Sequence, residues 1–189
     1  MPSTIIALGY RARSGKDTVG DYLVAKWGFT RIAFADKLKQ VVTTLTGQDA
    51  FETEFKFRTQ VSGFTGGQLL QQVGVALRGV HENIWIDASG LSGYAMIPGA
   101  RIVVTDCRFK NEAAAVKRLG GHLVEVCRPG LPTDMHASET GGMLINWDHV
   151  LDNSGTLTEL YVKVDALASC ILGAGQGSPQ AIQFPAPSR

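Results

Sequence analysis

The chain has 189 residues, of which 44% are hydrophobic, and its formal net charge is +1. This length can bury one good core and is too short for two sizeable domains. A nearly neutral chain is not expected to coat nucleic acid, and any anion binding must come from the local placement of Arg and Lys.

The three cysteines are Cys107, Cys127 and Cys170, which lie far apart and form no C-x-x-C pair. They predict neither a disulfide framework nor a zinc knuckle. The N-terminal region lacks a basic segment followed by a long apolar run, and no window approaches the roughly 18 apolar residues of a membrane span. We expect a reduced, soluble, cytoplasmic protein with no membrane or nucleic-acid partner, and the oligomeric state stays open, a homodimer included.

The first half of the chain alternates apolar runs with amphipathic stretches. "TIIALG" at 4–9 is rich in β-branched residues and ends at glycine, which predicts a buried parallel strand. A helix is expected over 16–28, with glycine at its C-terminal cap. "FTRIAF" at 29–34 predicts a second strand, and a second helix follows over 35–45. Polar residues, Phe and Gly then mark a long excursion over 46–67, which is either a binding element or a loose loop.

The second half continues the alternation. Helical spacing resumes over 67–80, a strand over 100–106 ends in an acid, and a short helix over 111–121 ends in glycines. The remaining predicted elements are two strands and a last helix, at 122–128, 147–153 and 157–171. Such alternation predicts a three-layer α/β fold, in which helices cover both faces of a mostly parallel five-stranded sheet.

The stretch over 173–189 combines Gly, Pro, Ser and Gln with little to bury. This composition predicts a disordered tail. We therefore expect one domain over 1–172.

"GYRARSGKDT" lies between the first predicted strand and the first predicted helix. Such a loop directs backbone N–H groups and the helix dipole at one spot, where phosphate binds, and a Lys at the helix start reaches the β- and γ-phosphates. The alternative is an ordinary strand-turn-helix with an acid favoured by the dipole. The expected phosphate-loop residues are Gly9, Arg11, Ala12, Arg13, Ser14, Gly15, Lys16, Asp17 and Thr18.

This loop departs from the usual pattern at two places. Five residues separate Gly9 from Gly15 where four are usual, so either Tyr10 occupies a glycine position or the loop is one residue longer. Asp17 stands where Ser or Thr usually holds Mg²⁺. Either Thr18 or Asp17 is expected to take that role.

The chain resembles the bacteriophage-type deoxynucleoside monophosphate kinases over most of 4–165, through "GYRARSGKDT", "FADKLK", "LLQQVGVALR", "VVTDCRFKNEAAAVKRLGGHLVEVCRP", "DMHASE" and "DHVLDNSGTL". It is also similar to animal phosphomevalonate kinases, which share the Gly-Lys-Asp loop and the Asp-x-Arg after the third strand. The resemblance implies a P-loop kinase that moves the γ-phosphoryl group of ATP in line to a deoxynucleoside 5′-monophosphate with Mg²⁺, in the host cytoplasm if it is of phage origin. The alternatives are another acceptor, phosphomevalonate or dephospho-coenzyme A, and a P-loop nucleotide switch.

Phosphoryl transfer needs bases that neutralise phosphate charge and an acid for the metal. Lys16 is expected at the β- and γ-phosphates. Asp106, at the end of a predicted strand, is placed like a metal-orienting acid, and a helix N-cap is its alternative. By resemblance Arg108 contacts the acceptor phosphate or the transferring group, with a surface ion pair to Glu112 as its alternative.

An acceptor-binding region is expected over about 46–80. The resemblance places Lys39 and Arg78 at the acceptor, and Arg58 joins them if the excursion folds over it. Phe34 and Trp85 are candidates for the walls of a base site, with plain core packing as the alternative. The complete set of acceptor candidates is Phe34, Lys39, Arg58, Arg78, Trp85, Arg108 and Glu112.

A closing lid is expected over about 128–146, where nucleotide kinases carry one. Arg128, at its root, is the only Arg or Lys in this stretch. We therefore expect Arg11 and Arg13 to clamp the phosphates in place of lid arginines.

Two further segments have candidate roles. "DMHASE" offers acid and His side chains without the spacing of a zinc site, so it is interpreted as the base of the lid. Asn153 and Gly155 belong to the turn after the last strand, which either reads adenine through its backbone or caps the last helix.

Overall fold

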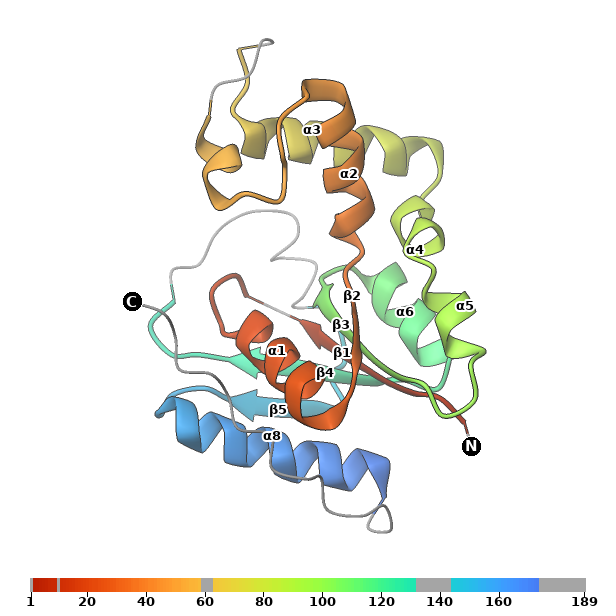
Figure 1. Cartoon of the computed structure of the whole chain (residues 1–189), viewed down its shortest axis with the longest axis vertical. Helices are drawn as coiled ribbons and strands as arrows, with labels where there is room; N and C mark the ends of the chain where they lie inside the picture. The colour runs from red at the N-terminus through yellow and green to blue at the C-terminus, as the bar shows by residue number, and fades with distance from the viewer. Residues whose placement is uncertain (1, 10, 59–62, 132–143, 174–189) are drawn as a thin grey trace.

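The computed structural model describes residues 2–9, 11–58, 63–131 and 144–173 (Figure 1). The strands form one parallel sheet in the order β2-β3-β1-β4-β5. Their bounds are β1 (Thr4–Gly9), β2 (Thr30–Ile32), β3 (Arg101–Cys107), β4 (His122–Cys127) and β5 (His149–Asp152). The predicted five-stranded parallel sheet is confirmed, and every strand lies within about two residues of its predicted range.

Helices cover both faces of this sheet, as predicted. The sequence did not suggest the two short helices α4 and α5, because five residues give too little of a helical period to be recognised. The helical elements are α1 (Lys16–Trp27), α2 (Ala35–Thr46), the 3₁₀ helix η1 (Thr53–Phe57), α3 (Gly66–Val80), α4 (Ile84–Ala88), α5 (Leu91–Ala95), α6 (Lys110–Arg118) and α8 (Leu157–Leu172).

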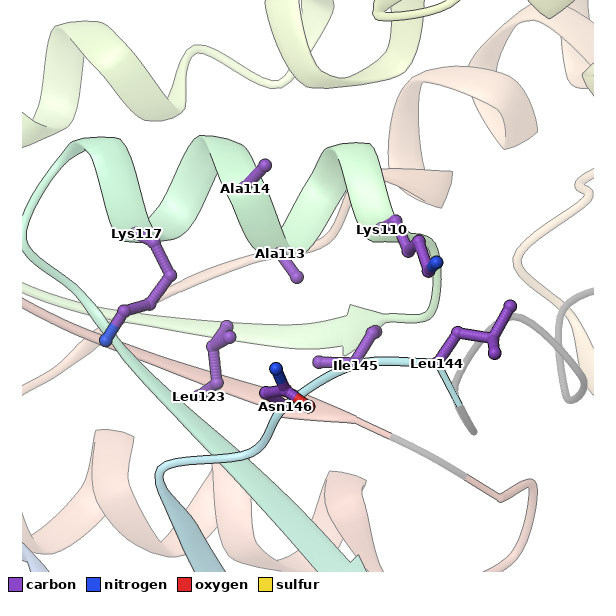
Figure 2. Close-up of a pocket in the computed structure, with 8 residues that line it drawn as sticks. All are labelled: Lys110, Ala113, Ala114, Lys117, Leu123, Leu144, Ile145 and Asn146. Atoms are coloured by element: carbon purple, nitrogen blue, oxygen red, sulfur yellow. The ribbon is translucent and has the colours of Figure 1, made fainter.

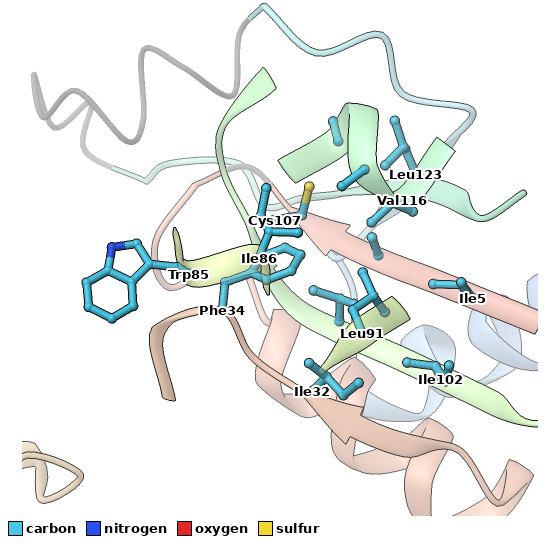
Figure 3. Close-up of a cluster of buried hydrophobic side chains, with 14 of the residues drawn as sticks. Ile5, Ile32, Phe34, Trp85, Ile86, Leu91, Ile102, Cys107, Val116 and Leu123 are labelled. Atoms are coloured by element: carbon cyan, nitrogen blue, oxygen red, sulfur yellow. The ribbon is translucent and has the colours of Figure 1, made fainter. Parts of the chain in front are cut away.

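β1 lies at the centre of the sheet and is buried on both faces, which explains its continuous apolar run. Ile5 and Ala7 point into the core beneath α4, α5 and α6, part of which Figure 3 shows. Ile6 and Leu8 point to the opposite core, beneath α1 and α8. Each buried aliphatic side chain of this size contributes about 1.5–3 kcal/mol, so the strand that precedes the phosphate loop is held from both sides.

α2, η1 and α3 form a separate layer beside the carboxyl ends of the strands, seen at the top of Figure 1. We call these three elements the acceptor layer, after the acceptor-binding region that the sequence predicts over about 46–80. They share a small core of their own, in which Val42, Ala50 and Phe55 are buried. The predicted excursion thus contains an anchored element, η1, although residues 59–62 lie outside the described ranges.

Helix ends follow local signals. Gly28 caps α1 in the left-handed region, with φ 67°, as predicted. Within the described ranges no helix has both the length and the apolar character needed to cross a bilayer. The predicted tail beyond Gly173 and residues 132–143 of the predicted lid, which hold Asp134, His136 and Glu139, lie outside the described residues.

Candidate phosphate-transfer site

The loop between β1 and α1 turns through two residues with positive φ, Arg13 at 61° and Gly15 at 101°. Gly15 is the N-cap residue of α1, and a Cβ there would overlap the side-chain amide of Asn153. Glycine is therefore required both for its backbone conformation and for the close approach. Loops with such left-handed residues at a helix start point N–H groups at a single anion, as the sequence predicts for this one.

Lys16 lies over this loop. Its side chain is largely buried, and Nζ donates to the carbonyl oxygen of Arg11 and to Oγ of Ser14, the latter at 3.5 Å. Ser14 is fully buried, so the loop closes around the ammonium group. Its positive charge is thereby held where phosphates would meet the loop.

A neighbouring turn supports the loop from the side. Nδ2 of Asn153 donates to the carbonyl oxygen of Ser14 at 2.8 Å, and the Asn153 backbone N–H donates to Cys127 at 2.7 Å. The turn does not cap α8: Thr156 does so, because its hydroxyl accepts from the N–H of Glu159. That alternative for Asn153 and Gly155 is wrong, and adenine reading by the turn stays a prediction.

Asp106, at the end of β3, joins the sheet to the acceptor layer. Its two carboxylate oxygens accept from the backbone N–H groups of Phe34 and Ala35, each at 2.8 Å. Asp106 therefore caps α2, whereas the sequence alternative had it cap the segment that begins at Arg108. Desolvation raises the pKa of Asp106, although the two N–H donors and Arg108 oppose the shift.

Arg31 is paired with one carboxylate and lies within electrostatic range of two others. Arg31 Nη1 donates to Oδ2 of Asp36 at 2.8 Å. Burial lowers the pKa of Arg31, but the hydrogen bond to Asp36 and the charges of Asp36, Asp106 and Asp17 raise it overall. Asp17, Asp36 and Asp106 are therefore close enough to act on one guanidinium group.

These oxygens fit Mg²⁺. Oδ1 of Asp36 is buried and, within the described part of the chain, accepts no hydrogen bond. Asp17 is exposed and Thr18 half-buried in the first turn of α1. Across the described ranges no three His, Cys, Asp or Glu side chains could hold a metal by themselves. Mg²⁺ uses one or two protein carboxylates beside phosphate and water, and the Mg²⁺ role of Asp17, Thr18 or Asp106 stays a prediction. Asp36 was missed by the sequence reasoning, since one acid in a helix's first turn is ordinary.

A second group of charges lies within electrostatic range of Asp17, in the first turn of α1. We call Lys39 of α2, Lys56 of η1 and Arg108 after β3 the cation cluster. Partial desolvation lowers the pKa of Lys56, as do the nearby charges of Lys39 and Arg108, while Asp17 opposes them. The structure thus brings the predicted Lys39 and Arg108 together and adds Lys56, which the sequence reasoning overlooked within "EFKFR".

The predicted ion pair between Arg108 and Glu112 is not among those of the described residues. Instead Oε2 of Glu112 accepts from the backbone N–H groups of Arg108 (2.8 Å) and Phe109 (3.1 Å). Arg108 precedes α6, so it does not share a helix face with Glu112. Glu112 is the third residue of α6, and its side chain thus caps the start of that helix from inside.

Glu112 also pairs with Arg78. Its Oε1 lies 3.4 Å from Nη2 of Arg78, whose guanidinium is 4.3 Å from the Phe109 ring centroid. Glu112 is 2% exposed, and burial, followed by the charge of Asp106, raises its pKa to about 7. Both oxygens are engaged by the protein, so this carboxylate orients Arg78 and the start of α6.

Four further predicted site residues lie outside the phosphate loop and the cation cluster. Phe34 and Trp85 are 1% and 3% exposed within the core of Figure 3, so the alternative of core packing holds and the base-wall hypothesis is corrected. Arg58 forms an ion pair with Glu52 at 2.9 Å. Arg128 is exposed at the end of β4, and roles for it and for Arg58 stay predictions.

Two surface pockets lie away from the phosphate loop and the cation cluster. Figure 2 shows a shallow pocket of about 190 Å³ between α6 and the residues before β5, lined by Lys110, Ala113, Ala114, Lys117, Leu123, Leu144, Ile145 and Asn146. A second, of about 480 Å³, includes Trp27, Tyr94 and Arg101. Neither is lined by a residue of the phosphate loop or the cation cluster.

Solved structures share this architecture. A dephospho-CoA kinase from Campylobacter jejuni is 12% identical with a TM-score of 0.55, covering 91% of this chain and 99% of that one. A shikimate kinase from Aquifex aeolicus is 14% identical with a TM-score of 0.50, covering 90% of this chain and 99% of that one. At such identities the likeness shows the fold alone, and it confirms the predicted three-layer α/β kinase fold.

Sequence comparisons identify the family. The family model for deoxynucleotide monophosphate kinase matches residues 67–164. A mimivirus protein named "Putative deoxynucleotide monophosphate kinase" is 33% identical over 183 residues, covering 86% of this chain and 93% of that protein. The deoxynucleotide monophosphate kinase of Escherichia phage RB69 is 36% identical over 66 residues, which are 34% of this chain and 27% of that protein. The chain therefore belongs to the deoxynucleotide monophosphate kinase family.

Proposed function

We propose that this enzyme transfers the γ-phosphoryl group of ATP to the 5′-phosphate of deoxynucleoside monophosphates, with Mg²⁺ as cofactor. Family membership makes deoxynucleoside monophosphates the acceptor class. The observation that supports the reaction is the presence of two positive sites near the start of α1: Lys16 over the phosphate loop, and the cation cluster, which lies within electrostatic range of Asp17. Two anionic substrates need two such sites before they can react in line.

Each site has a defined task. Lys16 and the loop N–H groups hold the β- and γ-phosphates of ATP, and Arg11 and Arg13 lie in the same loop to clamp charge that develops during transfer. Lys39 and Arg108 orient the acceptor phosphate. Mg²⁺, held by Asp17, Thr18, Asp36 or Asp106 through oxygen atoms, would neutralise phosphate charge when bound.

Phosphate repulsion is the main obstacle to this reaction. Asp106 fixes the distance between the two sites, because it bonds the first residues of the helix that carries Lys39. Asn153 fixes the loop from the other side through Ser14. Both contacts preorganise charge before the substrates arrive, which lowers the cost of bringing two anions together.

An acceptor panel tests this function. ADP formation from ATP and Mg²⁺ is measured with each of the four deoxynucleoside monophosphates, with the matching deoxynucleosides as controls that lack the phosphate. We expect ADP release only with monophosphates. ADP release that is the same with and without every acceptor would indicate a nucleotide switch. ADP release with dephospho-coenzyme A or phosphomevalonate but not with the nucleotides would assign another acceptor.

A further inference from the structure

Two carboxylates act on the cation cluster without pairing with it, Asp17 on Lys56 and Asp106 on Arg108. Among the ion pairs of the described residues, none includes Lys39, Lys56 or Arg108. Lys39 has instead the ring of Phe51, with Nζ 5.0 Å from its centroid. Like charges gathered from three elements repel one another, so the arrangement favours a bound anion that neutralises all three.

Packing supports the backbone at Lys56, while its side chain is exposed. The preceding residue, Phe55, is fully buried in the core of the acceptor layer. Gly66, at the start of α3, has no room for a Cβ because the Phe55 ring and carbonyl lie against it. At Gly67 a Cβ would lie 3.2 Å from the carbonyl oxygen of Lys56. η1 is thus wedged against α3, and Lys56 is presented from a supported backbone.

Arg58, two residues further on, is a useful contrast. Its guanidinium is paired with Glu52 at 2.9 Å, and both side chains are about half exposed. The sequence reasoning placed Arg58 at the acceptor if the excursion folds over it. Its charge is already compensated, whereas that of Lys56 is reinforced by two neighbouring cations.

We propose that Lys56 binds the phosphate of the acceptor nucleotide together with Lys39 and Arg108. The proposal rests on the proposed function, which supplies the monophosphate. Asp17, in the first turn of the phosphate-loop helix, is close enough to act electrostatically on Lys56, so a phosphate bound by the cluster lies next to the donor phosphates. η1 thereby becomes part of the catalytic site through one side chain.

Steady-state kinetics and calorimetry of Lys56→Ala test this role. We expect KM and Kd for the preferred monophosphate to rise about 10- to 100-fold, the scale for losing a hydrogen bond to a charged group, with little change in KM for ATP. Lys56→Arg should retain most of the affinity because it keeps the positive charge. Lys37→Ala is the matched control on α2, because Lys37 is exposed and donates to Gln40 at 3.1 Å; it should behave as wild type.

The outcomes separate this proposal from the proposed function. If Lys56→Ala binds and phosphorylates the monophosphate as wild type does, the role of Lys56 is overturned and the function stands. If the wild type neither binds nor phosphorylates any of the four monophosphates, both are overturned. Thermal unfolding verifies that Lys56→Ala is folded, and Lys56→Gln, which keeps the length of the side chain, replaces it for the same measurements if it is not.

Discussion

Replacing Asp106 by asparagine separates its structural role from a metal role. The native carboxylate accepts one backbone N–H on each oxygen, both at 2.8 Å. Asparagine has a single acceptor oxygen, and its NH₂ group would face an N–H donor. The variant loses one hydrogen bond to a charged acceptor and leaves a backbone donor unpaired, which together cost about 1.5–3 kcal/mol. The free energy of unfolding should fall by that amount.

Urea unfolding measures this loss as a lower midpoint at unchanged slope. Asp36→Asn is the matched control: it alters the neighbouring carboxylate, whose hydrogen bond goes to the partly exposed Arg31, and should cost less than about 1 kcal/mol. A Mg²⁺ titration of activity on both folded variants then locates the metal carboxylate. An Asp106→Asn protein as stable as wild type would show that the hydrogen bonds of the two Asp106 oxygens to the start of α2 do not stabilise the fold. An unchanged Mg²⁺ titration would refute a metal role for Asp106.

Three further outcomes are expected. Lys16→Ala should abolish phosphoryl transfer and leave thermal unfolding nearly unchanged; near-normal turnover would refute the phosphate-loop assignment. Arg11→Ala or Arg13→Ala should lower kcat by an amount that corresponds to about 2–4 kcal/mol of activation free energy, and the Arg→Lys variants should recover part of it. Normal turnover in both alanine variants would exclude the clamp. Burial and the charge of His149 lower the pKa of His122, so the free energy of unfolding should fall as the pH drops below the unfolded-state pKa of 6.5. Urea unfolding across pH 5–8 should show a weaker pH dependence for His122→Gln than for wild type. An unaltered pH dependence would contradict this role of His122.

Much of the fold could be predicted because its signals are local. The apolar run of β1, the left-handed cap at Gly28 and the stripe of α8 depend on nearby residues, and all were found where the sequence placed them. α4 and α5 were not predicted, because each has only five residues and is stabilised by packing against one face of the sheet.

The candidate site was predicted only in part, because its contacts join distant segments. Asn153 reaches Ser14 across 139 residues, and Asp106 reaches α2 across about 70, so no spacing rule reveals either contact. Helical spacing wrongly suggested a pair between Arg108 and Glu112, because it cannot show that the helix begins after Arg108. No local pattern singles out Lys56 for a similar reason, because the neighbouring charges that make it notable come from other segments.

The separate core of the acceptor layer has a consequence for local unfolding. Only a few side chains are fully buried in it, among them Val42 and Phe55, whereas the sheet is enclosed by two larger clusters. Regions with fewer buried apolar contacts open at lower free energy than the rest of a domain. Amide hydrogen exchange should therefore be faster in α2 and α3 than in β1. A monophosphate bound to the cation cluster would slow it there first, so substrate would rigidify the half of the enzyme that recognises it.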